Sequence, residues 1–369
     1  MLHQFNRLKV QRVAAGDSFS LALTESGKIY AWGIGQNGCL GLGDTTLSTA
    51  KPKRIQFSYP ADSIFMDGRP SAVTSIRFKA IAIGQSHCLA LTESGAVFSW
   101  GAGLNGRLGH GDLIGSAFPD QIRGLAHLVI IDIACGDSHS AALTEDGQIY
   151  TWGSSDNAKL GISEQIYVDR ERPYHVDYFT NTPIREIFLG LNNSFAISRT
   201  NEVFVWGSAN FGKVGIPKSS DWSIELPLKL WLRGTHNVYQ IAPGPFHTLF
   251  LSREGEMYVC GSSNEGKLGI FRLDERMVGK GFAGSSAGHF TIDWPWMLEE
   301  EIPAKFYLSR EDHDVFETYH NFNRLYSGQG LLKLGVGKSL ILQIVCSQTN
   351  SYILFSDGRV YAMGSNDAW

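Results

Sequence analysis

Short runs of alternating apolar and polar residues recur along the chain, and no repeat of the pattern follows the 3.6-residue period of an amphipathic helix. The runs Ser20 to Leu23 and Lys28 to Trp32 are examples, and Gly27 lies between them. Alternation with a period of two, interrupted by glycine, is typical of strands joined by hairpin turns. The pattern therefore predicts an all-β chain.

A glycine that follows such a strand recurs at a fixed distance from a Trp-Gly pair. The Trp, or the residue that replaces it, comes sixteen residues after the glycine or its replacement in every copy. The copies are Gly16 with Trp32-Gly33, Gly84 with Trp100-Gly101, Gly136 with Trp152-Gly153, Gly190 with Trp206-Gly207, Gly244 with Cys260-Gly261, and Ser347 with Met363-Gly364. The last copy keeps the spacing without the signature side chains, which indicates a constraint on the backbone.

A second fixed position lies eleven residues after each of these anchors. It is occupied by Gly27, Gly95, Gly147, Asn201, Gly255 and Gly358. The position separates two alternating runs, so we expect a hairpin turn with a left-handed residue. Asn201 fits the same turn because Asn tolerates positive φ better than other non-glycine residues.

The intervals between anchors define the repeat length. Each Trp-Gly or Cys-Gly pair of the first five repeats is followed by a Leu-Gly or Val-Gly pair, and the regular intervals are 52 to 54 residues. Two stretches are longer, and they contain insertions at residues 45–79 and 271–300. Phe306 to Asp312 echoes Leu249 to Gly255, which places a further repeat start near Glu301. The alternative for that stretch is a plain insertion.

Counting the Glu301 repeat, the chain holds seven repeats, each long enough for a four-stranded propeller blade. Such a blade has two apolar faces that must be covered by its neighbours, and we expect the aromatic residue of Trp-Gly to act as the wedge between blades. The first strand, Leu8 to Ala15, and the end of the chain after Gly364 are expected to close the ring by completing the last blade.

Composition and charge exclude several functional classes. A net charge of -4 gives no global electrostatic reason to bind nucleic acid or an anionic membrane. Apolar runs such as Leu128 to Ile131 are far shorter than the roughly 20 residues of a membrane span, and the start lacks a secretory signal. We expect a cytoplasmic protein, with nuclear or organellar locations as alternatives. The five scattered cysteines indicate neither a disulfide framework nor a metal site, and no cofactor is expected.

The segment from Ile133 to Gly153 closely resembles the regulator of chromosome condensation repeat, and the resemblance covers nearly the whole chain. It implies a seven-bladed β-propeller that forms a single domain over residues 1–369 and often acts as a protein-docking disc. Some members of that family are guanine-nucleotide exchange factors for a small GTPase.

The resemblance also implies candidate site residues. In the exchange factor that founded the family, acidic and histidine side chains just after the repeat glycine face the GTPase. The matching residues here are Asp17, His87, Asp137, His139 and His247. Phe19, Asn193 and Asn350 depart from the histidine pattern. The alternative reading is structural: a recurring histidine at this place bonds neighbouring backbone in a turn.

Two further family features are missing. The founding exchange factor has an extended wedge loop between Trp-Gly and Leu-Gly in one blade, whereas the five matching segments here have equal length. The plant ultraviolet-B photoreceptor of this family has Gly-Trp-Arg-His-Thr motifs at these loops, and none occurs here. An exchange activity would therefore depend on one of the two insertions.

Tryptophan and acidic residues in the least regular stretches are the other candidates for partner contacts, because Trp is enriched in interface hot spots. They are Trp222, Trp231, Trp294, Trp296, Glu299 and Glu300. Solvated loops are the alternative interpretation. Catalytic and metal-ligand motifs are not found, so an enzyme is not expected.

The leading hypothesis is a non-enzymatic propeller, monomeric or part of a larger complex, that docks proteins. The alternative is a guanine-nucleotide exchange factor for a Ran-like or other small GTPase.

Overall fold

The computed structural model describes residues 8–43, 46–57, 76–164, 167–216, 223–230, 237–253, 257–262, 304–306, 341–347, 350–356 and 358–364. The chain divides into two compact units. The first is Met1–Arg199 with Glu225–Pro227, and the second is Thr200–Ile224 with Leu228–Trp369. Each is described by itself below.

All regular elements in the described residues are strands and short 3-10 turns, which confirms the all-β prediction. The strands form six sheets, and within each sheet the strands follow chain order. The first sheet consists of β1 (Val10–Ala15), β2 (Phe19–Thr24), β3 (Ile29–Ile34) and β4 (Ser48–Arg54), and the second of β5 (Phe78–Ile83), β6 (His87–Thr92), β7 (Val97–Gly101) and β8 (Ser116–Gln121). The third sheet consists of β9 (Ile130–Cys135), β10 (His139–Thr144), β11 (Ile149–Gly153) and β12 (Arg170–His175), and the fourth of β13 (Ile184–Leu189), β14 (Asn193–Ser198), β15 (Val203–Ser208) and β16 (Ser223–Leu230). The fifth sheet consists of β17 (Val238–Pro243), β18 (His247–Ser252), β19 (Met257–Gly261) and β20 (Ala304–Phe306), and the sixth of β21 (Ile341–Cys346), β22 (Asn350–Phe355) and β23 (Val360–Gly364). The 3-10 turns are η2 (Gln36–Gly38), η3 (Leu104–Gly106), η4 (Arg123–Leu125), η5 (Asp156–Ala158), η6 (Asp177–Phe179) and η7 (Asn210–Gly212).

In the five sheets where it is described, the hairpin between the second and third strand has the left-handed residue that the spacing predicts, and Gly255 of the remaining sheet lies outside the described residues. In the first sheet Leu23 pairs with Ile29, and Gly27 has a φ of 72°. Asn201 has a φ of 66° at the matching position, so the prediction for the non-glycine repeat is confirmed. The Thr24 hydroxyl donates to the carbonyl of Lys28 at 3.1 Å and closes the turn from inside.

The glycine of each Trp-Gly pair is also required by the backbone. Gly33 has a φ of 111°, and a Cβ atom there would lie 2.6 Å from the Cα of Phe19. The pairing between the third and the outer strand shifts register at this point, from Ala31 with Lys53 to Gly33 with Thr49. Each of the first four outer strands carries a proline, which protects an exposed edge from pairing with another chain. These prolines are Pro52, Pro119, Pro173 and Pro227.

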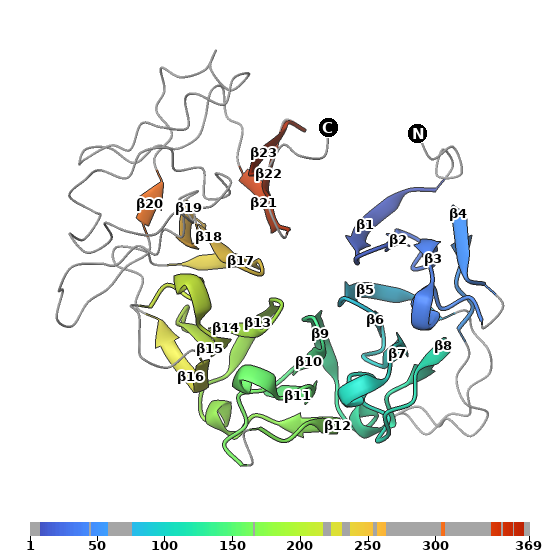
Figure 1. The fold of residues 1–369 in the computed structure, drawn as a ribbon, viewed down its shortest axis with the longest axis horizontal. Helices are drawn as coiled ribbons and strands as arrows, with labels where there is room; N and C mark the ends of the chain where they lie inside the picture. Colours follow the sequence, from blue (N-terminus) through green and yellow to red (C-terminus); the bar gives the residue numbers. More distant parts are fainter. Residues whose placement is uncertain are drawn as a thin grey trace, which may run out of the picture. The chain divides into compact units, whose positions relative to one another are not determined.

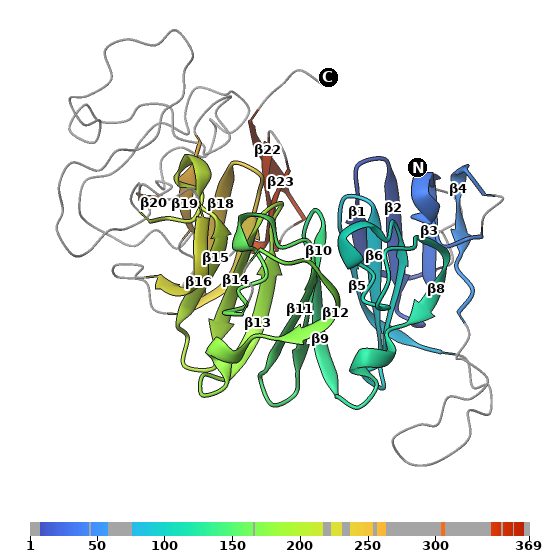
Figure 2. The same cartoon turned by 60° about the horizontal axis from the view of Figure 1, so that its bottom comes forward.

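Successive sheets within each compact unit pack through their apolar faces. In the first unit, β5 and β6 lie against β9, and the sheets follow one another from blue to green in Figures 1 and 2. Leu21, Phe78 and Trp100 share one core between the first two sheets. In the second unit, Leu249 and Ile353 share a core between the β17–β20 and β21–β23 sheets. The core therefore lies between sheets, as stacking blades require.

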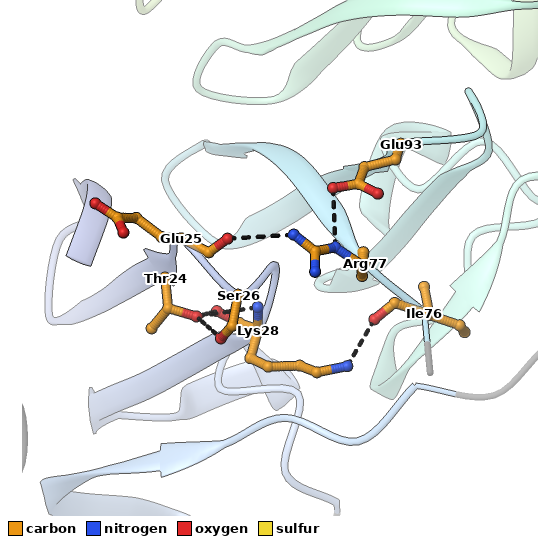
Figure 3. Close-up of polar contacts among 7 residues, drawn as sticks. All are labelled: Thr24, Glu25, Ser26, Lys28, Ile76, Arg77 and Glu93. Carbon is orange, nitrogen blue, oxygen red and sulfur yellow. Dashed lines mark hydrogen bonds and ion pairs between the residues drawn. The ribbon is translucent and has the colours of Figure 1, made fainter. Parts of the chain in front are cut away.

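Polar contacts join neighbouring sheets at the ends where the hairpins turn (Figure 3). The Lys28 ammonium donates to the carbonyl of Ile76 at 3.0 Å. Arg77 donates from Nε to the carboxylate of Glu93 at 3.0 Å and from its other nitrogen to the carbonyl of Glu25 at 3.4 Å. The arginine thus connects its own sheet to the hairpin of the preceding one. These groups are solvent-exposed, so the ion pair contributes roughly 0–1 kcal/mol.

The last part of the chain differs in detail from the sequence-based expectation. The predicted repeat start at Glu301 lies outside the described residues, and the adjacent β20 pairs with β19 as the outer strand of the fifth sheet. β1 belongs to the first sheet, where it pairs with β2, and is not part of the last blade. The β21–β23 sheet has three strands in the described residues, and residues 1–7 and 365–369 lie outside them.

Candidate functional site on the loops after the repeat glycines

The loop after each repeat anchor has the same backbone hydrogen bond. The amide of the anchor residue donates to the carbonyl of the residue three positions later, over 2.7–2.9 Å. The pairs are Gly16 with Phe19, Gly84 with His87, Gly136 with His139, Gly190 with Asn193, Gly244 with His247, and Ser347 with Asn350. Ser347 makes this bond without being a glycine, which explains why the spacing outlasts the side chain.

The histidines on these loops are fully buried. His87 is 0% exposed, and its Nε2 lies 2.9 Å from the hydroxyl oxygen of Ser140 in the next repeat. The Ser140 hydroxyl donates its own hydrogen to the carbonyl of Arg107 at 2.9 Å. Nε2 must therefore carry the ring hydrogen and donate to Ser140, because the serine has no second hydrogen.

The same arrangement recurs in later repeats. Nε2 of His139 lies 3.0 Å from the hydroxyl oxygen of Ser194, and Ser194 donates to the carbonyl of Lys159 at 2.8 Å. In the second compact unit, His247 lies 2.7 Å from the hydroxyl oxygen of Ser351. Each histidine therefore ties its repeat to the next one.

The repeat glycine exists to make room for this ring. A Cβ atom on Gly84 would lie 2.5 Å from Nδ1 of His87, and one on Gly136 would overlap the ring of His139. Gly-x-x-His is thus a packing motif. The implied role of His87, His139 and His247 as partner-facing groups does not fit their burial. The structural alternative is closer, although the bond goes to a serine hydroxyl of the next repeat and not to neighbouring backbone.

Burial keeps His87 and His139 neutral. It lowers the pKa of His87 to about 3, and Arg107 adds to the effect. Burial, followed by the positive charge of Lys159, also lowers the pKa of His139 far below its ordinary value. Removing an imidazolium from water costs more free energy than a hydroxyl partner returns. These two side chains are therefore hydrogen-bonding groups without an acid–base role near neutral pH.

The Trp-Gly and Leu-Gly motifs meet each other across the same junctions. Nε1 of Trp152 donates at 2.9 Å to the carbonyl of Arg107, which immediately precedes Leu108-Gly109. A Cβ atom on Gly109 would lie 2.9 Å from that nitrogen. Trp100 makes the matching bond to the carbonyl of Cys39 at 2.9 Å. The predicted role of the aromatic residue as a wedge between repeats is confirmed.

Cys260 takes over this function where the tryptophan is missing. Its thiol donates at 3.2 Å to the carbonyl of Lys213, the residue before Val214-Gly215. Cys260 is buried, and burial raises the pKa of its thiol far above the ordinary value. The cysteine is therefore a neutral donor and a packing residue, as expected for a buried structural thiol.

Sequence reasoning missed a set of buried cations beside these junctions. Arg107, Lys159 and Lys213 are 8%, 1% and 3% exposed. Lys159 donates to the hydroxyl of Ser138 at 2.9 Å and to the side-chain carbonyl of Asn192 at 3.0 Å. Burial lowers the lysine's pKa, and nearby carboxylates oppose the shift. A basic residue directly before Leu-Gly or Val-Gly in successive repeats was the available signal.

The two acidic candidates remain on the loop surface. Asp17 is exposed, and Asp137 is partly buried. The Asp137 carboxylate raises the pKa of both Arg107 and Lys159 against the effect of burial. Its Oδ1 has no hydrogen-bond partner among the described residues, and its amide donates to the carbonyl of Leu191 at 3.2 Å. Because Oδ1 is itself buried, it is not accessible to a partner in this structure.

A separate group of large apolar side chains is exposed on the first two sheets and their loops. We call it the rim patch, and it consists of Leu47 (74% exposed), Leu104 (65%), Leu113 (51%), Ile114 (72%) and Phe118 (59%). Single exposed apolar residues are ordinary, but several on neighbouring sheets and their loops are typical of an interaction surface.

Most of the predicted partner-binding insertions cannot be placed. Trp222, Trp231, Trp294, Trp296, Glu299, Glu300 and all of residues 271–300 lie outside the described residues. Of the first insertion, residues 46–57 and 76–79 are described. Phe57 packs into the core, with its ring centroid 4.2 Å from that of Phe78 and 5.7 Å from that of Trp100. This end of the first insertion is therefore structural.

The described part of the chain has neither a membrane-spanning helix nor a cluster of metal-binding side chains. No helix there is long and apolar enough to cross a membrane. No group of three or more His, Cys, Asp or Glu side chains in the same residues could hold a metal ion.

Comparison with known families finds the same repeat. The RCC1-like domain matches residues 64–283, which is more than half of the chain. The regulator of chromosome condensation (RCC1) repeat matches residues 10–39 and 26–91.

Curated relatives cover most of the chain but are longer proteins. The ultraviolet-B receptor of Arabidopsis thaliana is 30% identical over 263 residues, which is 71% of this chain and 55% of the receptor. A human E3 ubiquitin-protein ligase, HERC2, is 33% identical over 292 residues, which is 77% of this chain and 6% of the ligase. The chain thus spans about half of the receptor and a small part of the ligase.

Solved structures share the architecture. Yeast RCC1 (Prp20), solved in complex with Kap60, has a TM-score of 0.70 at 19% identity over 98% of this chain and 71% of that chain. Human WBSCR16 has a TM-score of 0.68 at 20% identity over 98% of this chain and 77% of that chain. At these identities the likeness shows the fold alone.

Proposed function

Because the chain belongs to the RCC1-like domain family, an all-β propeller of RCC1 repeats, we propose that it is a non-enzymatic docking module for other proteins. The observation that carries the proposal is the rim patch, where five large apolar side chains are at least half exposed. Exposing such side chains to water is unfavourable, and a protein partner that covers them removes that cost.

The residues at the junctions between repeats also support the docking proposal. The recurring histidine and tryptophan side chains form contacts between repeats, as His87 and Trp152 illustrate, and the recurring glycines leave space for them. They hold the scaffold together and leave the loops and insertions to vary. We place the specificity for partners on the rim patch and the insertions at 45–79 and 271–300. The chain acts as a monomeric propeller or as a subunit of a larger complex in the cytoplasm.

Guanine-nucleotide exchange on a small GTPase is the second candidate, and the Asp17 and Asp137 loops favour it. Both acidic side chains occupy positions that the family resemblance assigns to the GTPase-facing side. The yeast relative is described with binding to Gsp1p and histones as well as to Kap60. For the present chain, an exchange activity would consist of displacing the switch loops of a GTPase with no cofactor.

Nucleotide release separates the two candidates. Small GTPases loaded with a fluorescent guanine nucleotide are mixed with the full chain, and we expect no acceleration of release. Accelerated release would overturn the docking proposal. In that case Asp137→Ala should abolish the acceleration, and Glu171→Ala is the matched control, because Glu171 is exposed on β12 away from these loops.

Partner capture tests the placement of specificity. The full chain and a variant without residues 271–300 are compared for the proteins that each cross-links. We expect the deletion to remove a subset of partners. Identical partners for both forms would show that this insertion does not contribute.

A further inference from the structure

Strand β8 and the residues just before it carry part of the rim patch. Ile114 lies two residues before β8, and Phe118 lies where the pairing of β8 with β7 shifts register, between Ser116 and Asp120. Ile114 and Phe118 are 72% and 59% exposed, and Asp120 is exposed. Two large apolar side chains and a carboxylate near this strand are therefore presented to solvent.

Contacts across the first two repeats make the patch continuous. The Gly43 amide donates to the carbonyl of Ala117 at 3.1 Å, and a Cβ atom on Gly43 would lie 3.0 Å from the ring of Phe118. Phe118 thus lies on the loop of the preceding repeat. Leu47 follows on that loop, where its carbonyl accepts from the Gly35 amide at 2.7 Å.

Leu104 extends the patch at its other end. It follows Gly103, which is so close to the carbonyl of Ile114 that a Cβ atom on the glycine would overlap it. Leu104 and Ile114 therefore belong to one surface. Both are more exposed than the neighbouring Leu108, which is 1% exposed in the core.

Two exposed carboxylates, Asp112 and Asp120, belong to the loop before β8 and to β8 itself, and the exposed Arg123 follows the strand. Asp112 accepts from the amide of Ile114 at 3.0 Å, and Asp120 follows Phe118 on β8. Both carboxylates oppose the lowering of the His110 pKa. Burial, which is the dominant effect, lowers the pKa of His110 and keeps it neutral at physiological pH. The guanidinium of Arg172, beside Gly111, is another basic group at this end.

The backbone of β8 is not available for an added strand. The Phe118 amide donates to the hydroxyl of Ser116 at 3.2 Å, Pro119 has no amide hydrogen, and the Ala117 carbonyl already accepts from Gly43. A partner must therefore recognise side chains. Exposed apolar groups near two carboxylates suit the apolar stripe of a helix that carries basic residues at its border.

We propose that the rim patch binds an amphipathic helix of a partner protein, with apolar side chains against Leu104, Ile114 and Phe118 and with Lys or Arg residues beside Asp112 and Asp120. This inference rests on the docking function proposed above and names the chemistry of the partner. The apolar contacts provide the affinity, and the carboxylates select basic flanks.

The test uses the full chain and a phage-displayed peptide library. The library has a helical template with a fixed leucine stripe, and its flanking positions are randomised among Lys, Arg, Asp, Glu, Ser and Gln. We expect Lys and Arg to be enriched at the flanks. A synthetic peptide from the enriched pool should bind about tenfold or more weakly to Ile114→Ser and to Phe118→Ser, as for a truncated interface anchor.

Two controls make the result specific. Val168→Ser removes a side chain that is 47% exposed on the same compact unit outside the patch, and it should leave the affinity unchanged. Asp112→Asn with Asp120→Asn should remove the preference for basic flanks while leucine-dependent binding remains. Circular dichroism of each variant verifies the fold, which should persist because the altered side chains are exposed.

Several outcomes would overturn the inference. Unbiased or acidic flanks would contradict the charge argument, and full affinity in Ile114→Ser and Phe118→Ser would contradict the location. A lack of any enriched peptide would contradict the helix. Self-association in sedimentation that Ile114→Ser abolishes would identify a second copy of the chain as the occupant. Nucleotide release and the cross-linked partners of the deletion variant are measured independently of these peptides, so the broader docking proposal is tested separately.

Discussion

Asp132 offers a quantitative test of how the sheets of the first compact unit enclose a charge. It lies on β9, the strand that begins the third sheet. Burial raises the pKa of its carboxyl from 3.8 to about 6, and the negative charge of Glu186 acts in the same direction. The charge of Arg12 opposes the shift. We predict that Asp132→Asn stabilises the protein at neutral pH.

The magnitude follows from the two pKa values. The folded state holds the Asp132 proton more tightly than the unfolded chain, so ionisation penalises folding above the folded pKa and ceases to do so as the pH falls through both values. The penalty that Asn removes is about 3 kcal/mol at pH 7.5, about 1.5 kcal/mol at pH 5 and about 0.5 kcal/mol at pH 4. Relaxation around the charge makes the first value an upper limit.

The assay is thermal unfolding of wild type and variant between pH 4 and pH 7.5. The gain in midpoint temperature of Asp132→Asn should be largest at pH 7.5 and should shrink as the pH is lowered. Asn keeps the acceptor oxygen that receives the Ile133 amide at 2.9 Å. Asp120→Asn is the matched control, because Asp120 accepts from the Gln121 amide in the same way at 2.8 Å but is exposed. Its substitution should change the midpoint little at any pH.

The opposite result would refute the reasoning. If Asp132→Asn destabilises the protein at pH 7.5, Arg12 stabilises the ionised carboxylate by more than burial costs it. A gain that does not depend on pH would point to packing or to the unfolded chain as its source.

Three further substitutions, with Gly212→Ala as a control, test the junctions between repeats, each by thermal unfolding. Gly84→Ala places a methyl group against the His87 ring and should cost about 3 kcal/mol or prevent folding. Gly212 has open space around it, and only its φ of +68° opposes a side chain, so Gly212→Ala should lower the free energy of unfolding by about 1 kcal/mol. Equal losses at Gly84 and Gly212 would contradict the packing role of the repeat glycine. Ser140→Ala leaves the Nε2 hydrogen of His87 without an acceptor in a buried site and should cost about 1–3 kcal/mol, whereas a neutral effect would mean that this hydrogen bond does not contribute to stability. Trp152 and Ser140 both donate to the carbonyl of Arg107, so Trp152→Phe removes one of its two donors and should cost about 1–2 kcal/mol. The loss in the double variant Ser140→Ala with Trp152→Phe should differ from the sum of the two single losses.

Repeat spacing and turn chemistry were readable from the chain because they are local. Gly27 and Asn201 have the left-handed φ that their place between two alternating runs predicts. The Trp-Gly glycines, such as Gly33, have positive φ for the same kind of reason. A backbone position that excludes most side chains leaves its mark on the residue at that position, so periodic glycines were sufficient to place most strands and their order.

The role of the recurring histidines depends on contacts with the next repeat, so the structure changed the interpretation of the candidate site. The sequence from Gly84 to His87 does not indicate that the His87 ring is buried against the glycine. Nor does it indicate that the ring's hydrogen-bond partner is Ser140, 53 residues further along the chain. A histidine on an exposed loop and a buried histidine with a serine partner have the same sequence pattern. Only the neighbouring sheet distinguishes them, because it supplies both the hydrogen-bond partner and the burial that keeps the ring neutral.

The pattern along the chain thus determined the class of fold, the repeat and the turns, since period-two alternation and obligatory glycines are properties of single strands and hairpins. Burial was decided by the packing of one repeat on the next. Leu108 and Ile114 are similar aliphatic residues only six positions apart, yet the first is 1% exposed in the core and the second is 72% exposed on the rim patch. Which apolar side chains remain free for a partner depends on what the adjacent sheet covers, and that is a property of the assembled fold.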